Sequence, residues 1–255
     1  MSLKHFFIAT VCALTLAGCA DGPNYEHMSA SQLYQGGEQN LASTHYELAI
    51  KHFEALQANY PFGDDAQKAQ LQLMYAYYKH NETSSAVAAA DRFIRLYPRS
   101  PRVDYAYYIK GLSELEENRG VLMRYLPLDL AQRDLAGVRN AFNDFSLLLQ
   151  LFPGSPYAGA ARQQMVYLRD ILAKHEIETA QYYMLRQAYV AAANRATYVI
   201  NHFQHAPSVE NALVLSVKAN MKLKQKQSAR DAYRVLQLNY PHNKQLPSLK
   251  ALVAA

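Results

Sequence analysis

Few residues in this sequence have the type and spacing that catalysis needs. The run His175–Thr179 begins like the HExxH motif of zinc proteases but lacks the second histidine. His202 and His205 lie about one helical turn apart with no third candidate ligand beside them, so surface histidines are the simpler interpretation. Three glutamates between positions 114 and 117 have the pattern of a solvated helix end, and the sequence contains neither a glycine-rich phosphate loop nor a GxSxG motif. The sequence therefore predicts no enzyme, no metal site and no cofactor.

One cysteine, in contrast, has a context that indicates covalent modification. Residues 6–16 form an apolar run, FFIATVCALTL, which is too short to span a bilayer and has the length of a signal-peptide core. The run ends in Leu16–Cys19, LAGC, which resembles the bacterial lipobox. That resemblance implies cleavage before Cys19 and attachment of a diacylglycerol thioether and an N-acyl chain to it. The alanine at position 20 then favours sorting to the outer membrane. The alternative is an ordinary secretory signal peptide with a chance cysteine.

The overall composition is that of a globular protein. Of 255 residues, 50% are hydrophobic and 18% are charged, and the formal net charge is +5. Lysine and arginine do not run in blocks, which argues against nucleic acid as a partner. Two cysteines can build neither a disulfide framework nor a cysteine-rich zinc site.

An aromatic–proline pair recurs along the chain, and Phe203-Gln204 has the form of a fifth copy that lost its proline. The four complete pairs are Tyr60-Pro61, Tyr97-Pro98, Phe152-Pro153 and Tyr240-Pro241. When the five copies are aligned, the residue twelve places before the second member of each pair is always alanine: Ala49, Ala86, Ala141, Ala192 and Ala229. The residue five places before is always bulky: Leu56, Phe93, Leu148, Val199 and Leu236. A small residue that lets two helices approach, followed by a bulky one that fills the gap, predicts repeated helix pairs.

The proline of each pair should end the second helix, and Ser100-Pro101 and Ser155-Pro156 should begin the next one as N-cap and first helical residue. This is the tetratricopeptide pattern, which has a period of about 34 residues. We therefore expect an all-α fold, a right-handed helical solenoid of about five tetratricopeptide-like repeats. Successive copies are 37, 55, 51 and 37 residues apart. The two long spacings predict an insertion at Asn118–Gly137 in the third repeat and an extended helix in the fourth. The apolar insertion either caps the core of its own repeat or contacts a partner.

These features divide the chain into five parts. Residues 1–18 are the expected signal peptide, and residues 19–29 are the lipidated cysteine with a flexible tether. Residues 30–137 hold repeats 1 and 2 and the first part of repeat 3 with its insertion. Residues 138–248 hold the C-terminal repeats, and residues 249–255 form a tail.

The sequence motifs inside the repeats are more specific than the repeat pattern itself. The runs YPFG at 60–63, YAYYK at 75–79 and DRFIRLYP at 91–98, with AFNDFSLL at 141–148 and LRDILAKHEIETAQYY at 168–183, resemble the outer-membrane protein assembly factor BamD family, also called competence lipoprotein ComL. The resemblance covers about residues 25–242, and the chain departs from it at Gln204 and in a basic C-terminal segment.

The resemblance implies a non-catalytic scaffold lipoprotein of the β-barrel assembly machinery, anchored in the outer membrane and facing the periplasm. Its implied partners are a BamA-like barrel subunit, bound through a periplasmic POTRA domain near the C-terminal repeats, and accessory lipoproteins such as BamC. It also implies that the N-terminal repeats receive C-terminal β-strand signals of unfolded outer-membrane proteins.

Two sets of residues are candidates for these contacts. The first helix of each repeat lines the concave face of such a solenoid, and a groove of tyrosines with one lysine could take an extended segment that ends in an aromatic residue and a carboxylate. The groove candidates are Tyr34, Tyr75, Tyr78, Lys79, Tyr105 and Tyr108; packing between helices is the alternative role for each tyrosine. Arg195, a large charge in the run AAANRAT, is the candidate docking residue for the barrel subunit.

Three further expectations stay open at this point. Five basic residues from Lys218 to Arg234 follow each other at i,i+4 spacing, but a repeat boundary near 224–227 should split this stripe between two helices. A tetratricopeptide pilotin for a secretin is one alternative function, although regular 34-residue spacing would suit it better. A peptidoglycan-associated adaptor lipoprotein is the other.

Overall fold

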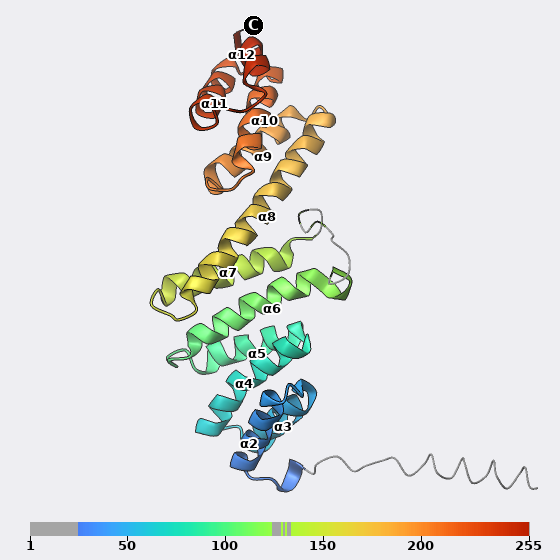
Figure 1. Cartoon of the computed structure of the whole chain (residues 1–255), viewed down its shortest axis with the longest axis vertical. Helices are drawn as coiled ribbons and strands as arrows, with labels where there is room; N and C mark the ends of the chain where they lie inside the picture. The colour runs from blue at the N-terminus through green and yellow to red at the C-terminus, as the bar shows by residue number, and fades with distance from the viewer. Residues whose placement is uncertain (1–24, 124–128, 130, 132–133, 255) are drawn as a thin grey trace, which may run out of the picture. The chain divides into compact units, whose positions relative to one another are not determined.

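The computed structural model describes residues 25–123, 129, 131 and 134–254 (Figure 1). Within these residues every regular element is a helix, which confirms the predicted all-α class. None of the described helices has both the length and the apolar character that crossing a membrane requires. The chain divides into two compact units, residues 1–76 and residues 77–255.

The first unit holds a short 3₁₀ helix η1 (Tyr25–His27), α2 (Ala30–Ala42), α3 (Tyr46–Asn59) and most of α4 (Asp64–His80). Ser29 and Gln32 form a capping box at the start of α2, because each side chain bonds the backbone of the other residue. The ring of Tyr25 lies edge-on to His52 of α3, with 4.8 Å between the ring centroids. Tyr25, which lies inside the segment expected to be a tether, therefore packs against the first repeat.

The second unit continues with helices that each pack against the next one in the chain. They are α5 (Thr83–Leu96), α6 (Val103–Met123), α7 (Ala136–Leu151), α8 (Ala158–Leu185), α9 (Tyr189–His202), α10 (Val209–Lys222), α11 (Lys226–Asn239) and α12 (Leu246–Ala254). Nearest-neighbour packing of this kind is characteristic of helical repeats. At 28 residues, α8 is the extended helix that the spacing predicted for the fourth repeat.

The aligned positions of the repeats form the core between paired helices. All five aligned alanines are 0% exposed, and so are all five bulky residues, each of which lies about two helical turns later. The close approach is visible at Gly111 of α6, where an added Cβ would lie 2.8 Å from Cε1 of Phe145 on α7. Small residues on one helix thus admit the large rings of its partner.

The second helix of every repeat ends at the residue before the aromatic position. The backbone N–H of each aromatic residue bonds the carbonyl four residues earlier and leaves the helical region there. Phe203 does so without a following proline, through a 2.9 Å bond to the carbonyl of Val199. The fifth copy is thereby confirmed, and the proline reinforces an end that packing already fixes.

The next helices begin two residues later than Ser100-Pro101 and Ser155-Pro156 predicted. The backbone carbonyl of Ser155 accepts the N–H of Ala158 at 3.0 Å, and its hydroxyl oxygen accepts the N–H of Tyr157 at 3.1 Å. The serine therefore closes a tight turn, and α8 starts after it. Ser100 builds the same turn before α6.

Four of the turns inside repeats use a left-handed residue five places before the aligned alanine. These residues are Thr44, Asn81, Gln187 and Lys224, with φ between 59° and 69°. At Lys224 this turn separates α10 from α11, so the basic i,i+4 stripe is split between two helices as predicted.

The expected insertion at Asn118–Gly137 is partly helical, since α6 continues to Met123 and α7 begins at Ala136. Of the residues between, Ala131 is 1% and Leu135 is 3% exposed. Asp129 pairs with Lys174 of α8, and the carbonyl of Ala131 lies 2.6 Å from Nδ1 of His175. These contacts support the core-capping role for the described part; residues 124–128, 130, 132 and 133 lie outside the described residues.

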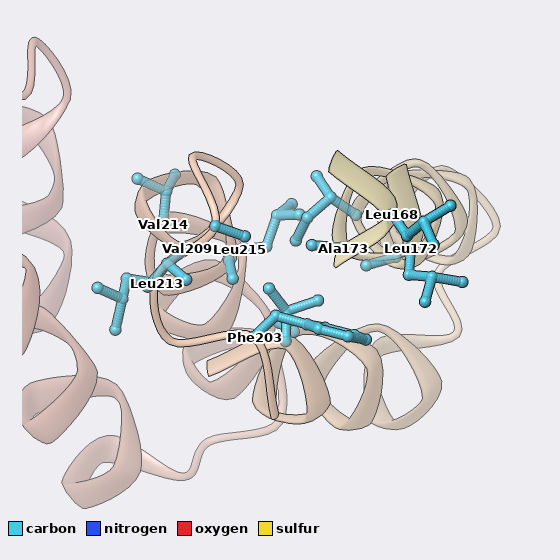
Figure 2. Close-up of a cluster of buried hydrophobic side chains, with 14 of the residues drawn as sticks. Leu168, Leu172, Ala173, Phe203, Val209, Leu213, Val214 and Leu215 are labelled. Atoms are coloured by element: carbon cyan, nitrogen blue, oxygen red, sulfur yellow. The ribbon is translucent and has the colours of Figure 1, made fainter. Parts of the chain in front are cut away.

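The C-terminal helices close the core of the second unit. Residues Leu249 and Val253 of α12 are buried, so α12 crosses the boundary at 248–249 beyond which a tail was expected. Helix α10 is buried on most of its circumference because α8, α9, α11 and α12 all contact it. Figure 2 shows part of one apolar cluster, to which α10, α8 and Phe203 contribute. The labelled residues are Val209, Leu213, Val214 and Leu215 of α10, Leu168, Leu172 and Ala173 of α8, and Phe203.

Candidate docking site around Arg195

A buried charge lies behind the candidate docking residue. The inner face of α8 carries apolar residues at helical spacing, among them Leu172, Ala173, Ile177 and Ala180. Glu176 lies in the same stripe, and its side chain is only 7% exposed. A carboxylate in such a position needs a charged partner to compensate for lost hydration.

Arg195 of α9 supplies that partner. Its Nη1 donates to Oε2 of Glu176 at 2.9 Å, and Nη2 of Arg139 on α7 lies 4.0 Å from Oε1. The hydrogen bond to Glu176 raises the pKa of Arg195 above its ordinary value, and an arginine is charged at any physiological pH. Its side chain remains 46% exposed. Glu176 thus holds one edge of the Arg195 guanidinium, Tyr183 also interacts with it, and nearly half of the side chain stays accessible to solvent.

The guanidinium borders two hollows in the surface. The larger one, about 510 Å³, is lined by both polar and apolar side chains. It is lined by Arg139, Phe142, Asn143, Leu172, Glu176, Arg195, Tyr198 and Phe203. The smaller one, about 370 Å³, is lined by Tyr183, Ala191, Asn194, Arg195 and Tyr198. A third hollow of about 470 Å³ follows at the α8–α9 turn and shares Ala191 and Asn194 with the second.

The outer face of α9 between these hollows exposes apolar side chains. Val190 is 59% and Tyr198 is 44% exposed, and Leu185 at the end of α8 is 83% exposed. Aromatic and aliphatic side chains around an arginine have the composition of a protein–protein interface. The arrangement can therefore accept an apolar side chain in a hollow and a carboxylate at Arg195. We call residues Val190, Ala191, Asn194, Arg195 and Tyr198 the α9 face.

The groove tyrosines fall into both units. Tyr34 and Tyr75 belong to the first, and the ring of Tyr34 lies 6.1 Å from that of Phe53. Burial raises the pKa of Tyr34, with a further contribution from Glu38. Tyr78 and the exposed Lys79 lie on the part of α4 that belongs to the second unit.

The structure brings Tyr105 and Tyr108 together around a residue that the sequence did not single out. Tyr157 stacks on Tyr108 with centroids 5.0 Å apart and lies 5.4 Å from Tyr105. Tyr108 also lies 6.0 Å from Phe145, and burial raises its pKa. Packing between repeats is therefore one role of Tyr108.

A second buried charge lies between α5, α6 and α7. Nζ of Lys110 is 3.0 Å from Oδ1 of Asp91 and 3.2 Å from Oδ1 of Asp144. Oδ2 of Asp144 is buried without a hydrogen-bond partner. Burial raises the pKa of Asp144 to about 6, although Lys110 opposes the shift. None of the three hollows near α9 borders this cluster, and we assign it to packing between α5, α6 and α7.

Among the described residues no group of histidine, cysteine, aspartate or glutamate side chains could hold a metal ion. Cys19, the predicted lipid attachment site, lies outside the described residues. Sequence reasoning missed Glu176 as the partner of Arg195, and it missed Arg139 as the second arginine near that carboxylate. The burial of Glu176 could have been predicted from the sequence, because it lies at helical spacing among the buried apolar residues of α8.

Comparisons with known proteins assign the chain to a family. The model of the outer membrane lipoprotein family YfiO matches residues 26–235. The outer membrane protein assembly factor BamD of Neisseria meningitidis serogroup B is 38% identical over 246 residues, which cover 94% of this chain and 92% of that protein. BamD of Vibrio cholerae is 32% identical over 239 residues, 93% of this chain and 99% of that protein. The protein of that name in Haemophilus influenzae is 30% identical over 238 residues, 93% and 90% of the two chains. With this coverage and identity, the chain belongs to the BamD family of outer membrane lipoproteins.

Proposed function

We propose that this chain is a scaffold lipoprotein of the outer-membrane β-barrel assembly machinery, required for folding and insertion of outer-membrane proteins. The observation that carries the proposal is the match of the whole repeat region to proteins named outer membrane protein assembly factor. We further infer that it acts without catalysis, by holding partners together. Helical repeats suit this role because they present long surfaces built from neighbouring helix pairs.

The α9 face is the proposed docking surface for the POTRA domain of a BamA-like barrel subunit. Arg195 would bind a carboxylate of the POTRA domain, since its guanidinium is held by Glu176 and half exposed. The hollows on either side would take apolar side chains next to that carboxylate. A preoriented arginine loses little conformational entropy on binding, which favours a strong contact at this position.

Two finer assignments belong to the same proposal. The chain would be attached to the outer membrane by lipids on Cys19 and would face the periplasm, and the tyrosines of the N-terminal repeats would receive C-terminal signals of unfolded outer-membrane proteins. Tyr75, Tyr78 and Lys79 are the residues to test for that second role. BamC-like accessory lipoproteins are further proposed partners.

Depletion and complementation test the proposed function. Loss of the chain should lower the amount of heat-modifiable, folded porin in the outer membrane, and the unchanged chain should restore it. Arg195→Glu should fail to restore it, because it reverses the charge of the docking residue beside the buried Glu176. Arg162→Glu, an equal charge change at an exposed position of α8 outside the described hollows, should restore it fully. Unchanged porin levels after depletion would refute the proposal and favour a peptidoglycan or secretin partner.

A further inference from the structure

The C-terminal end of the chain is strongly basic, whereas the rest of the chain is slightly acidic. Residues 218–255 contain eight lysines and arginines against one aspartate, a formal charge of +7. The whole chain carries +5, which leaves −2 for residues 1–217. The basic residues lie at the end of α10, on α11 and around α12, which adjoin one another in the fold (Figure 1).

Most of this charge faces solvent. Seven of the eight basic residues are exposed: Lys222, Lys224, Lys226, Arg230, Arg234, Lys244 and Lys250. Two of the basic residues also contact the fold: Lys218 donates to Gln245 at 2.7 Å, and Nε of Arg230 lies 3.5 Å from the carbonyl oxygen of Val253. The single acid, Asp231, accepts from Gln227 and lies 3.8 Å from Arg234.

Exposed aliphatic side chains lie on the same helices. Leu238 is 80%, Val235 is 42% and Leu252 is 39% exposed. Basic groups mixed with exposed aliphatic residues suit an interface with phospholipid, where the charges meet headgroup phosphates and the apolar groups enter the headgroup region. An acidic protein would also attract the charge. The membership of the chain in a family of outer membrane lipoproteins places a phospholipid surface within its reach.

We propose that the surface formed by the end of α10, α11 and α12 binds anionic phospholipid headgroups, as a second membrane contact besides any lipid anchor. Each lysine or arginine near an anionic bilayer contributes about a fivefold factor in the partition coefficient. The contact is electrostatic and falls with ionic strength. It does not depend on docking at the α9 face, whose residues it does not share.

Vesicle sedimentation tests this inference with the non-lipidated chain from Ala20 onward, which keeps every described helix. Vesicles of phosphatidylethanolamine and phosphatidylglycerol should bind it, neutral phosphatidylcholine vesicles should not, and added salt should release it. The variant K222Q/K224Q/R234Q/K250Q removes four such factors and should lower the partition coefficient by about 600-fold. The control R92Q/R95Q/R99Q/R102Q removes four exposed arginines around α5 and the start of α6, an equal change of net charge, and should change binding less than fivefold.

Equal losses in both variants would overturn the assignment to this surface, because binding would then follow net charge alone. Equal binding to the neutral vesicles would overturn the headgroup chemistry. A third outcome is that the chain binds no vesicle but binds polyglutamate, and that the C-terminal variant loses this binding. That outcome would overturn the proposed lipid contact in favour of an acidic protein partner. Circular dichroism of both variants establishes that each remains folded.

Discussion

Replacing Asp144 by asparagine should stabilise the protein at neutral and alkaline pH. Asp144 is 5% exposed, and burial raises the pKa of its carboxyl from 3.8 to about 6. Because the folded-state pKa is above the unfolded value, folding favours the protonated form. The ionised carboxylate therefore costs stability above about pH 6, and this cost disappears as the pH falls towards 4. A shift of about two pKa units corresponds to about 3 kcal/mol in the free energy of unfolding.

The asparagine side chain resembles the protonated aspartic acid, because it is neutral and keeps an oxygen that can accept from Lys110. The second amide position replaces Oδ2, which already has no partner. Lys110 keeps its 3.0 Å contact with Asp91. After allowance for the weaker contact with Lys110, we expect Asp144→Asn to raise the free energy of unfolding by about 2 kcal/mol at pH 8.

Urea unfolding monitored by circular dichroism at pH 8 and pH 4 measures this effect. The advantage of the variant should fall below about 1 kcal/mol at pH 4, where Asp144 is protonated in both the folded and unfolded states for much of the population. Asp91→Asn is the matched control, since it removes the more exposed carboxylate that contacts the same lysine, and it should change stability by less than about 1 kcal/mol. A variant D144N that is less stable than the unchanged chain at pH 8 would show that the ion pair with Lys110 outweighs the burial cost, and would refute the reasoning.

Two other predictions concern packing and backbone conformation, and thermal unfolding checks both. Gly111→Ala should destabilise the protein by about 1–3 kcal/mol, because the new Cβ would overlap the ring of Phe145. Gly159→Ala, at a helical position with open space around it, should instead be neutral or stabilising, and equal losses in both variants would contradict the packing argument. Thr44→Gly should stabilise the protein by about 1 kcal/mol, because it removes a β-branched residue held at φ 59°. Asn81→Gly should change the stability little, since asparagine tolerates this backbone conformation. A destabilised T44G variant would show that the threonine side chain compensates for its backbone strain.

The repeat architecture could be predicted from the sequence because its signal is carried by local chemistry. The buried alanine and the bulky residue recur at a fixed distance from each aromatic position, and the second helix of each repeat ends just before that aromatic residue, with or without a proline after it. The exact starts of α6 and α8 could not be predicted, since Ser100 and Ser155 can either cap a helix or close a turn with the same hydroxyl.

Only part of the candidate site could be predicted from the sequence. Arg195 stood out as a charge among alanines, but its partner lies nineteen positions away on another helix, and Arg139 comes from a third. Their meeting depends on how α7, α8 and α9 pack. The stacking of Tyr157 on Tyr108 likewise arises from the tertiary packing of the helices, and nothing near Tyr157 in the sequence indicates it.

Affinity purification of the full chain, expressed with its own N-terminus, from gently solubilised outer membrane tests the proposed function most directly. The account predicts that a POTRA-bearing barrel protein co-purifies in near-equal amount, that Arg195→Glu loses it, and that Arg162→Glu retains it. Recovery of a secretin, or of peptidoglycan fragments without the barrel protein, would contradict the assigned function while leaving the repeat fold intact.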